Sequence, residues 1–301
     1  MRQKRFFATL GAMQFLTFND VSFTYPPVED DRDADGNPIL PQPVFEHFSA
    51  ELPHGFVSFV GQNGCGKSTL LLLASGRLPP QTGSVTLLGQ NPALLPQEAK
   101  NLLASFIYQN MEFESSDKVS ELLSQVYAGG ALKGRASGIR DQSTDLLSEC
   151  IDVFELASVL NHTLTGISKG EMQRVLLAFS LLYGSASIFM DEPLFAMEEP
   201  QKERALAYLR DFVHKTGTSV YLSMHELDLT RRYADTVLLF YPDRTMDLGT
   251  PEEVLTKDAL EKAYGVPHVL LKDGEEYTRK HLQDVSEAIK DLNERKSEQK
   301  L

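Results

Sequence analysis

The stretch Gly61-Gln62-Asn63-Gly64-Cys65-Gly66-Lys67-Ser68-Thr69 decides how the rest of this sequence is interpreted. It fits the pattern of a glycine, four variable residues and then Gly-Lys-Ser, which is typical of a phosphate-binding loop. Glycines allow positive φ and carry no Cβ, so successive backbone N–H groups can turn toward one anion. An apolar run that favours a strand, 56–60, precedes the stretch, and an apolar helical run, 70–74, follows it. The sequence therefore predicts an α/β fold with a strand, a phosphate loop and a helix in succession.

The polar residues of this loop have separate predicted roles. Lys67 supplies a point charge for the β- and γ-phosphates of a nucleotide, and the Ser68 hydroxyl can ligate Mg²⁺. The helix that follows adds unpaired N–H groups and the positive end of its dipole. We therefore expect a magnesium-bound nucleoside triphosphate at this loop.

The composition excludes some classes of partner. The chain has 301 residues, 42% of them hydrophobic and 24% charged, which is ordinary for a globular protein. A formal net charge of −13 gives no basic surface for nucleic acid, so we expect no direct binding to DNA or RNA. The two cysteines provide no disulfide framework and suit a reducing compartment, so the cytosol is the expected location.

The N-terminus has the order of a signal peptide, with Arg2, Lys4 and Arg5 before an apolar run. We expect no export, because an ATP-type site follows. Residues 1–12 are interpreted as an extension, with Met13 as an alternative start. The longest apolar candidate for a membrane span, 175–190, is interrupted by serines and a glycine, so we do not expect the chain to cross a membrane.

The first part of the chain predicts β-structure around a polar insertion. Residues 14–18 and 21–25 flank Asn19-Asp20, which indicates a hairpin. Residues 26–43 are rich in proline and acidic residues, and we interpret them as a solvated loop inserted before an edge strand at 44–52.

Strands and helices alternate in the rest of the chain. An α-rich subdomain is expected at about 113–170, because apolar residues recur there at helical spacing. Ser168 and Glu171 form a predicted capping box that opens the next helix. Residues 268–301 are dense in charge and are interpreted as a solvated helix or tail. Further strands are expected at 83–89, 104–108, 187–191, 218–224 and 235–240.

Polar side chains follow several of these strands. In an open parallel sheet, ligands bind beyond the carboxyl ends of the strands. Asp191 is suited to hold Mg²⁺ together with Ser68, and Glu192 is the candidate general base that polarises the attacking water. Gln109 can bridge the metal and the water, and His225 can hydrogen-bond the γ-phosphate. These residues predict a site that hydrolyses a nucleotide.

These motifs resemble those of the nucleotide-binding subunits of ATP-binding cassette (ABC) transporters. The resemblance extends roughly from Phe15 to Gly265. The discriminating motif is the signature Ile167-Ser168-Lys169-Gly170-Glu171, because other phosphate-loop enzymes lack it. The phosphate loop, the Gln109 segment, the strand that ends at Asp191-Glu192 and the switch histidine His225 occur in the family's order. Tyr25 matches the family's aromatic residue that stacks on adenine, although it could also be an ordinary strand aromatic.

The resemblance implies a fold, two partners and a location. The fold is a phosphate-loop NTPase domain (13–267) with a parallel sheet core, an N-terminal antiparallel β subdomain and an inserted helical subdomain. In a head-to-tail dimer, Ser168, Gly170 and Glu171 of one subunit would close over ATP on the loop of the other. The helical subdomain and the Gln109 segment would dock on a separate integral membrane permease. The chain would then lie at the cytoplasmic face of a membrane.

Three features depart from the family pattern. Lys169 stands where the signature usually has glycine, Glu198 stands where the loop after the acidic strand usually has aspartate, and the acidic insertion 26–43 is unusual. None of them removes a catalytic group, so hydrolysis is expected.

Two other functions remain open from the sequence. One is a soluble cassette ATPase that acts as a mechanical switch in translation or DNA repair, and the other is a nucleotide-sensing scaffold without turnover. The segment 249–255, with 263–266, resembles the C-terminal part of bacterial importers for iron-siderophore, haem or cobalamin. This resemblance favours an importer.

Overall fold

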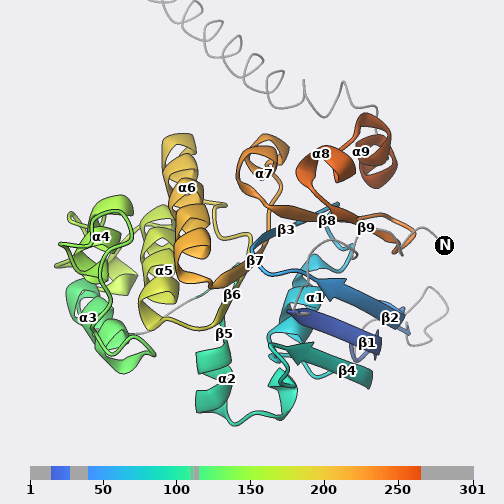
Figure 1. Ribbon diagram of the computed structural model, residues 1–301, viewed down its shortest axis with the longest axis horizontal. Helices are drawn as coiled ribbons and strands as arrows, with labels where there is room; N and C mark the ends of the chain where they lie inside the picture. The colour runs from blue at the N-terminus through green and yellow to red at the C-terminus, as the bar shows by residue number, and fades with distance from the viewer. Residues whose placement is uncertain (1–14, 28–39, 110, 112–114, 266–301) are drawn as a thin grey trace, which may run out of the picture.

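The computed structural model describes residues 15–27, 40–109, 111 and 115–265 (Figure 1). The predicted N-terminal extension, most of the acidic insertion and the charged tail at 268–301 lie outside the described residues. The predicted domain ends at 13 and 267 lie outside them as well.

The centre of the molecule is a six-stranded sheet with the strand order β5-β6-β7-β3-β8-β9. Neighbouring strands are parallel from β5 to β8, and only the edge strand β9 is antiparallel to its neighbour. Nearly every residue of β3, β6, β7 and β8 is buried, which explains why these segments are almost continuously apolar. The strands are β3 (Phe56–Val60), β5 (Ala104–Ile107), β6 (Ser187–Asp191), β7 (Ser219–Ser223), β8 (Thr236–Phe240) and β9 (Met246–Gly249).

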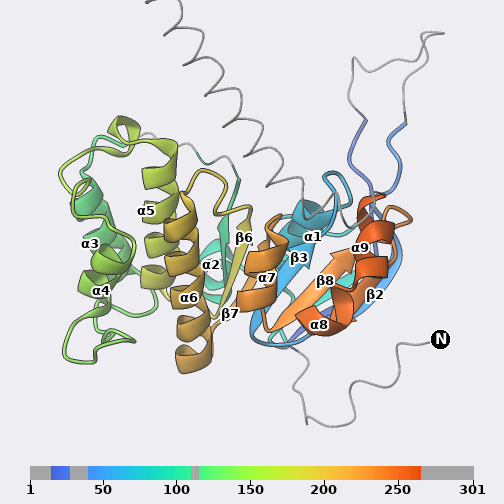
Figure 2. The same cartoon turned by 90° about the horizontal axis from the view of Figure 1, so that it is seen from above.

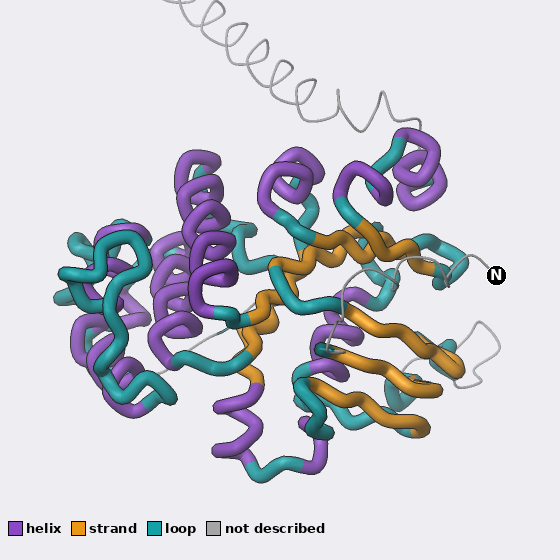
Figure 3. The backbone as a smooth tube through the Cα atoms, in the orientation of Figure 1, coloured by secondary structure: helices purple, strands orange, loops and turns teal. Residues whose placement is uncertain are grey.

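A separate three-stranded antiparallel sheet packs beside the central sheet, with the order β2-β1-β4 (Figure 3). Its strands are β1 (Leu16–Phe23), β2 (Phe45–Leu52) and β4 (Thr82–Leu87). The predicted hairpin at Asn19-Asp20 is wrong, because β1 is one continuous strand in the middle of this sheet. Asp20 adopts the left-handed φ of 54°, and the register with β2 shifts between Phe18 and Val21. The turn-like pair therefore forms a bulge.

Helices cover both faces of the central sheet (Figures 1 and 2). On one face, α1 (Lys67–Ala74) lies between the two sheets and contacts β4, β6 and β7. On the other face lie α6 (Glu199–Thr216), α7 (Leu227–Tyr233) and α8 (Pro251–Val254), in contact with β7, β3 and β8 respectively. α9 (Lys257–Tyr264) follows α8 and packs into the same apolar cluster as β8.

A group of helices lies at the end of the molecule away from the three-stranded sheet (Figure 2). It consists of α3 (Val119–Gly129), α4 (Leu146–Val153) and α5 (Lys169–Tyr183), and α5 contacts both of the others. These helices contain the apolar residues that the sequence places at helical spacing, among them Val119, Leu123 and Leu146 in the core. Shorter elements complete the described chain: the 3₁₀ turns Pro92–Leu94 and Leu164–Gly166, and α2 (Gln97–Leu103).

Among the residues that the structure describes, no helix combines the length and the apolar character needed to span a membrane.

Candidate functional site: the phosphate loop and the acidic strand end

The phosphate loop joins β3 to α1, as the sequence predicts. Gly61, Gly64 and Gly66 have φ values of 151°, 79° and 104°, all in the region that favours glycine. At two of these glycines there is also too little room for a side chain. A Cβ on Gly61 would lie 2.9 Å from the Phe240 Cβ, and one on Gly66 would lie 3.1 Å from the Phe45 Cζ. A side chain at either position would therefore strain the backbone and force its neighbours apart.

Lys67 is the first residue of α1, and its side chain folds back over the loop. Its Nζ donates to the carbonyl oxygens of Gly61 at 2.8 Å and Gln62 at 2.9 Å, and the residue is buried. A positive charge is thereby fixed against the turn of glycines. Burial raises the pKa of the Cys65 thiol, although the nearby Lys67 ammonium opposes the shift. Cys65 is therefore a thiol at neutral pH.

The other loop residues have different surroundings. Ser68 and Asn63 are exposed. The Gln62 amide donates to the Tyr264 carbonyl at the end of α9, so this helix holds one side of the loop. Thr69 is buried, and its hydroxyl lies 3.0 Å from the Tyr25 hydroxyl.

Tyr25 lies beside the loop in space, although 44 residues separate it from Thr69 in sequence. Its ring meets the Phe23 ring edge-on and remains 42% exposed. An exposed aromatic face next to a phosphate loop is available for stacking on a base. This placement fits the role that the resemblance gives to Tyr25.

The register of the central sheet brings the acidic strand end level with the phosphate loop. Ser223 on β7 is opposite Asp191 on β6 and also opposite Phe59 on β3, two residues before the loop begins. The Ser223 hydroxyl donates to Asp191 Oδ1 at 2.7 Å and accepts from the Glu192 N–H at 2.9 Å. Ser223 therefore joins the two acidic residues. Sequence reasoning did not assign it, although a polar residue at the end of an apolar strand was a usable signal.

Glu192 stands at the centre of the predicted catalytic residues. The Gln109 Nε2 donates to its Oε2 at 2.7 Å, and the His225 Nε2 lies 2.6 Å from its Oε1. The Glu192 side chain is only 16% exposed, and its backbone adopts the left-handed φ of 48°. Such a conformation costs a residue with a side chain about 1 kcal/mol or more, and outliers of this kind cluster at functional sites. The structure thus brings together three side chains that the sequence analysis grouped.

His225 has a second connection, through its neighbour in sequence. Glu226 forms an ion pair with Lys202 on α6, and both side chains are largely buried. Burial alone would raise the pKa of the Glu226 carboxyl, but the bond and charge of Lys202 lower it overall. The pair ties the segment that carries His225 to the first turns of α6.

The signature residues form the start of α5. The Glu171 carboxylate accepts from the Ser168 N–H at 2.8 Å, and the Ser168 Oγ accepts from the Glu171 N–H at 3.3 Å. These bonds confirm the predicted capping box, and they lower the pKa of the Glu171 carboxyl. A Cβ on Gly170 would lie 2.5 Å from the Ala196 carbonyl oxygen, so only glycine fits against the loop that follows Glu192. Within the described residues, Ser168 and Glu171 use their side chains to bond each other and not the chain's own phosphate loop.

The two unusual residues of these motifs both lie at helix starts. Lys169 is the first residue of α5, and Glu198 is the N-cap of α6, where it forms a capping box with Gln201. At Glu198 the Gln201 amide oxygen accepts from the Glu198 N–H at 3.4 Å.

A cavity of about 290 Å³ adjoins the phosphate loop at Gly64 and Cys65. Its other walls come from residues 42–44, at the end of the insertion, and from the turn after β8. Arg244 in that turn donates to the Pro43 carbonyl and closes one side.

The phosphate loop, the six-stranded sheet and the acids that end β6 define a phosphate-loop NTPase fold of the cassette type. The chain belongs to the ABC transporter family, whose sequence pattern matches residues 45–195.

Individual relatives agree with this family. A cobalamin import ATP-binding protein, BtuD of Halobacterium salinarum, is 29% identical over 208 residues, which cover 69% of this chain and 51% of that protein. The chain thus spans about half the length of that relative. A hemin import ATP-binding protein, HmuV of Escherichia coli O157:H7, is 29% identical over 237 residues, covering 76% of this chain and 89% of that protein.

Solved structures show the same fold. An ATP-binding subunit of an ABC transporter superposes with a TM-score of 0.65 at 21% identity, over 86% of this chain and 98% of that one. A metal-chelate type ABC transporter in an inward-facing conformation gives a TM-score of 0.59 at 20% identity, over 84% of this chain and 90% of that one. The predicted fold class and the resemblance are confirmed.

Proposed function

We propose that this chain is the ATP-hydrolysing subunit of an ABC importer. The observation that carries the proposal is the Glu192 carboxylate, which Gln109 and His225 hold at the strand end beside the phosphate loop. Family membership supports ATP as the nucleotide. Phosphoryl transfer requires mainly positioning and charge neutralisation, and these residues are arranged to provide both.

Each residue has a definite task in this proposal. The N–H groups of the glycine turn and the Lys67 ammonium bind the phosphates, and the Tyr25 ring supports the base. Glu192 accepts the proton of the attacking water, with its carboxylate oriented by Gln109. His225 hydrogen-bonds the γ-phosphate. Its contact with Glu192 couples the binding of that phosphate to the position of the carboxylate.

The donor atoms near the loop fit Mg²⁺. This ion prefers oxygen ligands and is usually bound by one or two carboxylates together with substrate phosphates and water. Ser68 offers a hydroxyl, Asp191 offers the carboxylate oxygen that does not bond Ser223, and Gln109 offers its amide oxygen. When bound, Mg²⁺ would neutralise charge on the β- and γ-phosphates.

The partners follow from the family. We infer a head-to-tail dimer in which Ser168 and Gly170 of each subunit complete the ATP site of the other, and a separate membrane permease that receives the closing motion. The chain would then lie on the cytoplasmic face of a membrane. The names of the relatives, cobalamin and hemin importers, support a metal-chelate or tetrapyrrole cargo.

Phosphate release from ATP by the purified chain tests the central claim. We expect Mg²⁺-dependent turnover that disappears in Glu192→Gln, while this variant still binds ATP. A Glu192→Gln variant that turns over ATP at the parent rate would remove Glu192 from the role of base.

Co-purification tests the partner. An integral membrane protein that co-purifies with the tagged chain supports the importer. Sedimentation with ribosomes or DNA would instead support the soluble mechanical ATPase.

A further inference from the structure

The end of α4 contains a glutamate at a position that normally favours glycine. The Leu156 N–H donates to the Ile151 carbonyl at 2.9 Å, and the Glu155 N–H donates to the Asp152 carbonyl at 3.1 Å. This pair of bonds defines a Schellman motif, whose left-handed residue is usually glycine. Here that residue is Glu155, with a φ of 53°. A strained residue of this kind calls for a compensating interaction.

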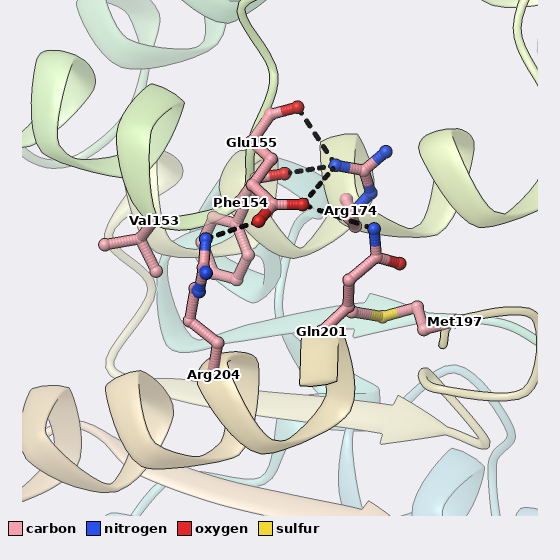
Figure 4. Close-up of a pocket in the computed structure, with 7 residues that line it drawn as sticks. All are labelled: Val153, Phe154, Glu155, Arg174, Met197, Gln201 and Arg204. Atoms are coloured by element: carbon pink, nitrogen blue, oxygen red, sulfur yellow. Dashed lines mark hydrogen bonds and ion pairs between the residues drawn. The ribbon is translucent and has the colours of Figure 1, made fainter. Parts of the chain in front are cut away.

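The Glu155 carboxylate provides that interaction by joining two other helices (Figure 4). From α6, Arg204 forms an ion pair with Oε1, and the Gln201 amide donates to Oε2 at 3.3 Å. From α5, the Arg174 Nη1 lies 3.6 Å from Oε2. One carboxylate therefore lies between two guanidinium groups that would otherwise face each other as like charges.

Arg174 fixes the position of α5 against α4 without help from the carboxylate. Its Nη1 donates to the carbonyl oxygens of Phe154 at 2.8 Å and Glu155 at 2.9 Å, and the side chain is 9% exposed. These bonds satisfy carbonyls at the C-terminus of α4. Because they use the main chain, they do not depend on the side chain of residue 155. The carboxylate specifically adds the link from α4 and α5 to α6.

A neighbouring part of the α5 surface contacts the loop that follows Glu192. The Gln173 Oε1 accepts from the Ala196 N–H at 3.0 Å, and Gly170 packs against the Ala196 carbonyl. That loop leads directly into α6, whose N-cap is Glu198. The first two turns of the signature helix are thus held both by the loop, at Gly170 and Gln173, and by the Glu155 junction, at Arg174, and both supports lead to α6.

From this arrangement we propose that Glu155 is a positioning residue, which fixes the signature residues Ser168 and Gly170 relative to α6 and the loop after Glu192. This inference rests on the proposed function, in which the signature acts on ATP bound to a second subunit. Loss of the carboxylate leaves the ATP site of the same chain intact and misplaces the signature. The ATP concentration needed to close the dimer therefore rises, and turnover at saturating ATP changes little.

Glu155→Gly is the most informative variant. It removes the carboxylate and at the same time relieves the left-handed strain, so the fold should be retained. Glu155→Gln removes the charge and keeps the strain. The matched control is Glu203→Gln, which breaks the ion pair of Glu203 with Arg232. The Glu203 and Arg232 side chains are 42% and 49% exposed. The Glu155 and Arg204 side chains are exposed to nearly the same extent, 42% and 46%.

Two measurements decide the matter. The first is made in a Glu192→Gln background, which keeps ATP bound, and it records the ATP concentration at half-maximal dimerisation. We expect Glu155→Gly and Glu155→Gln to raise this concentration by about fivefold or more, which is the lower end of typical coupling between sites. We expect no change from Glu203→Gln. In single variants with Glu192 intact, the KM for ATP should rise while kcat remains near that of the parent chain.

Hydrogen exchange without nucleotide provides an independent result. Amides in 168–176 should exchange faster in Glu155→Gly, with those of β3 and β7 unchanged. Unchanged exchange in 168–176 overturns the proposal, and so does an unshifted dimerisation curve. A parent chain that binds no ATP counts against the proposed function instead, and the exchange measurement still decides the role of Glu155.

Discussion

Glu192 and Glu155 share an unusual geometry and differ in what surrounds them. Both adopt left-handed φ values, 48° and 53°, and both carboxylates are held by side chains from distant parts of the chain. The partners of Glu192 are the Gln109 amide and the His225 imidazole, and neither is an arginine or a lysine. The partners of Glu155 include two arginines, Arg174 and Arg204, whose positive charges face the carboxylate. The same backbone strain therefore occurs at the proposed catalytic base and at a junction between helices.

The largest expected effect is a difference in the rate of ATP hydrolysis between variants of Glu192 and of Glu155. Glu192→Gln should lower the rate of ATP hydrolysis by about 10²- to 10⁴-fold, the usual contribution of general base catalysis. Glu155→Gln should leave the rate at saturating ATP within about twofold, because its carboxylate touches no reacting atom. Steady-state phosphate release measures both. Comparable losses of kcat in the two variants would contradict the different roles proposed for Glu192 and Glu155.

His225→Ala tests how far Glu192 depends on its partners. A hydrogen bond to a charged group is worth about 1.5–3 kcal/mol, so the rate should fall by roughly 10- to 100-fold, less than with Glu192→Gln. The double variant should be no slower than Glu192→Gln alone, because residues that act as a unit are not additive. Additive losses would indicate that His225 acts independently of the carboxylate.

A third glutamate, Glu149 in the regular part of α4, extends the comparison to the free energy of unfolding. Its buried carboxylate accepts from the Tyr208 hydroxyl on α6 at 2.6 Å and from the N–H groups of residues 139–141. Burial alone would raise its pKa, but these hydrogen bonds lower it overall. Glu149→Gln should cost about 1–3 kcal/mol in the free energy of unfolding at neutral pH.

The stabilisation by Glu149 should also depend on pH. Because the folded-state pKa is lowered, the carboxylate stabilises the fold above its ordinary pKa of 4.5, and this contribution is lost as the pH falls through the lower folded-state value. Urea unfolding of the parent chain and of Glu149→Gln at pH 7 and at about pH 3 measures the difference, which should shrink in acid. A difference that is constant with pH would assign the loss to packing instead of charge.

The smallest effect is expected from Glu155→Gly. Relief of the left-handed conformation gains about 1 kcal/mol, and loss of a partly exposed ion pair costs about 0–1 kcal/mol, so the free energy of unfolding should change by less than about 1 kcal/mol. Thermal unfolding monitored by circular dichroism provides the measurement. A marked destabilisation would mean that Glu155 contributes chiefly to the fold.

The secondary structure shows where local patterns suffice. The phosphate loop and the capping box at Ser168 follow from short motifs, because nearby backbone atoms alone satisfy their requirements. The bulge at Asp20 was predicted as a hairpin turn, because asparagine and aspartate tolerate left-handed backbone in either structure. The pairing of β1 with β2 and β4 decides between them, and those partners are distant in sequence. No element was predicted over the residues that form α6, although its buried residues recur at helical spacing and were a usable local signal.

Residue types at short spacing were enough to identify the phosphate loop and the family, and to predict roles for Asp191, Glu192 and His225. The tertiary structure alone decided that Ser223 joins the two acids, that Tyr25 reaches Thr69, and that Glu155 links three helices. These contacts connect residues from 19 to 49 positions apart, and a strained glutamate has no local pattern that distinguishes it from an ordinary one. Only the packing of the chain brings such groups within hydrogen-bonding distance.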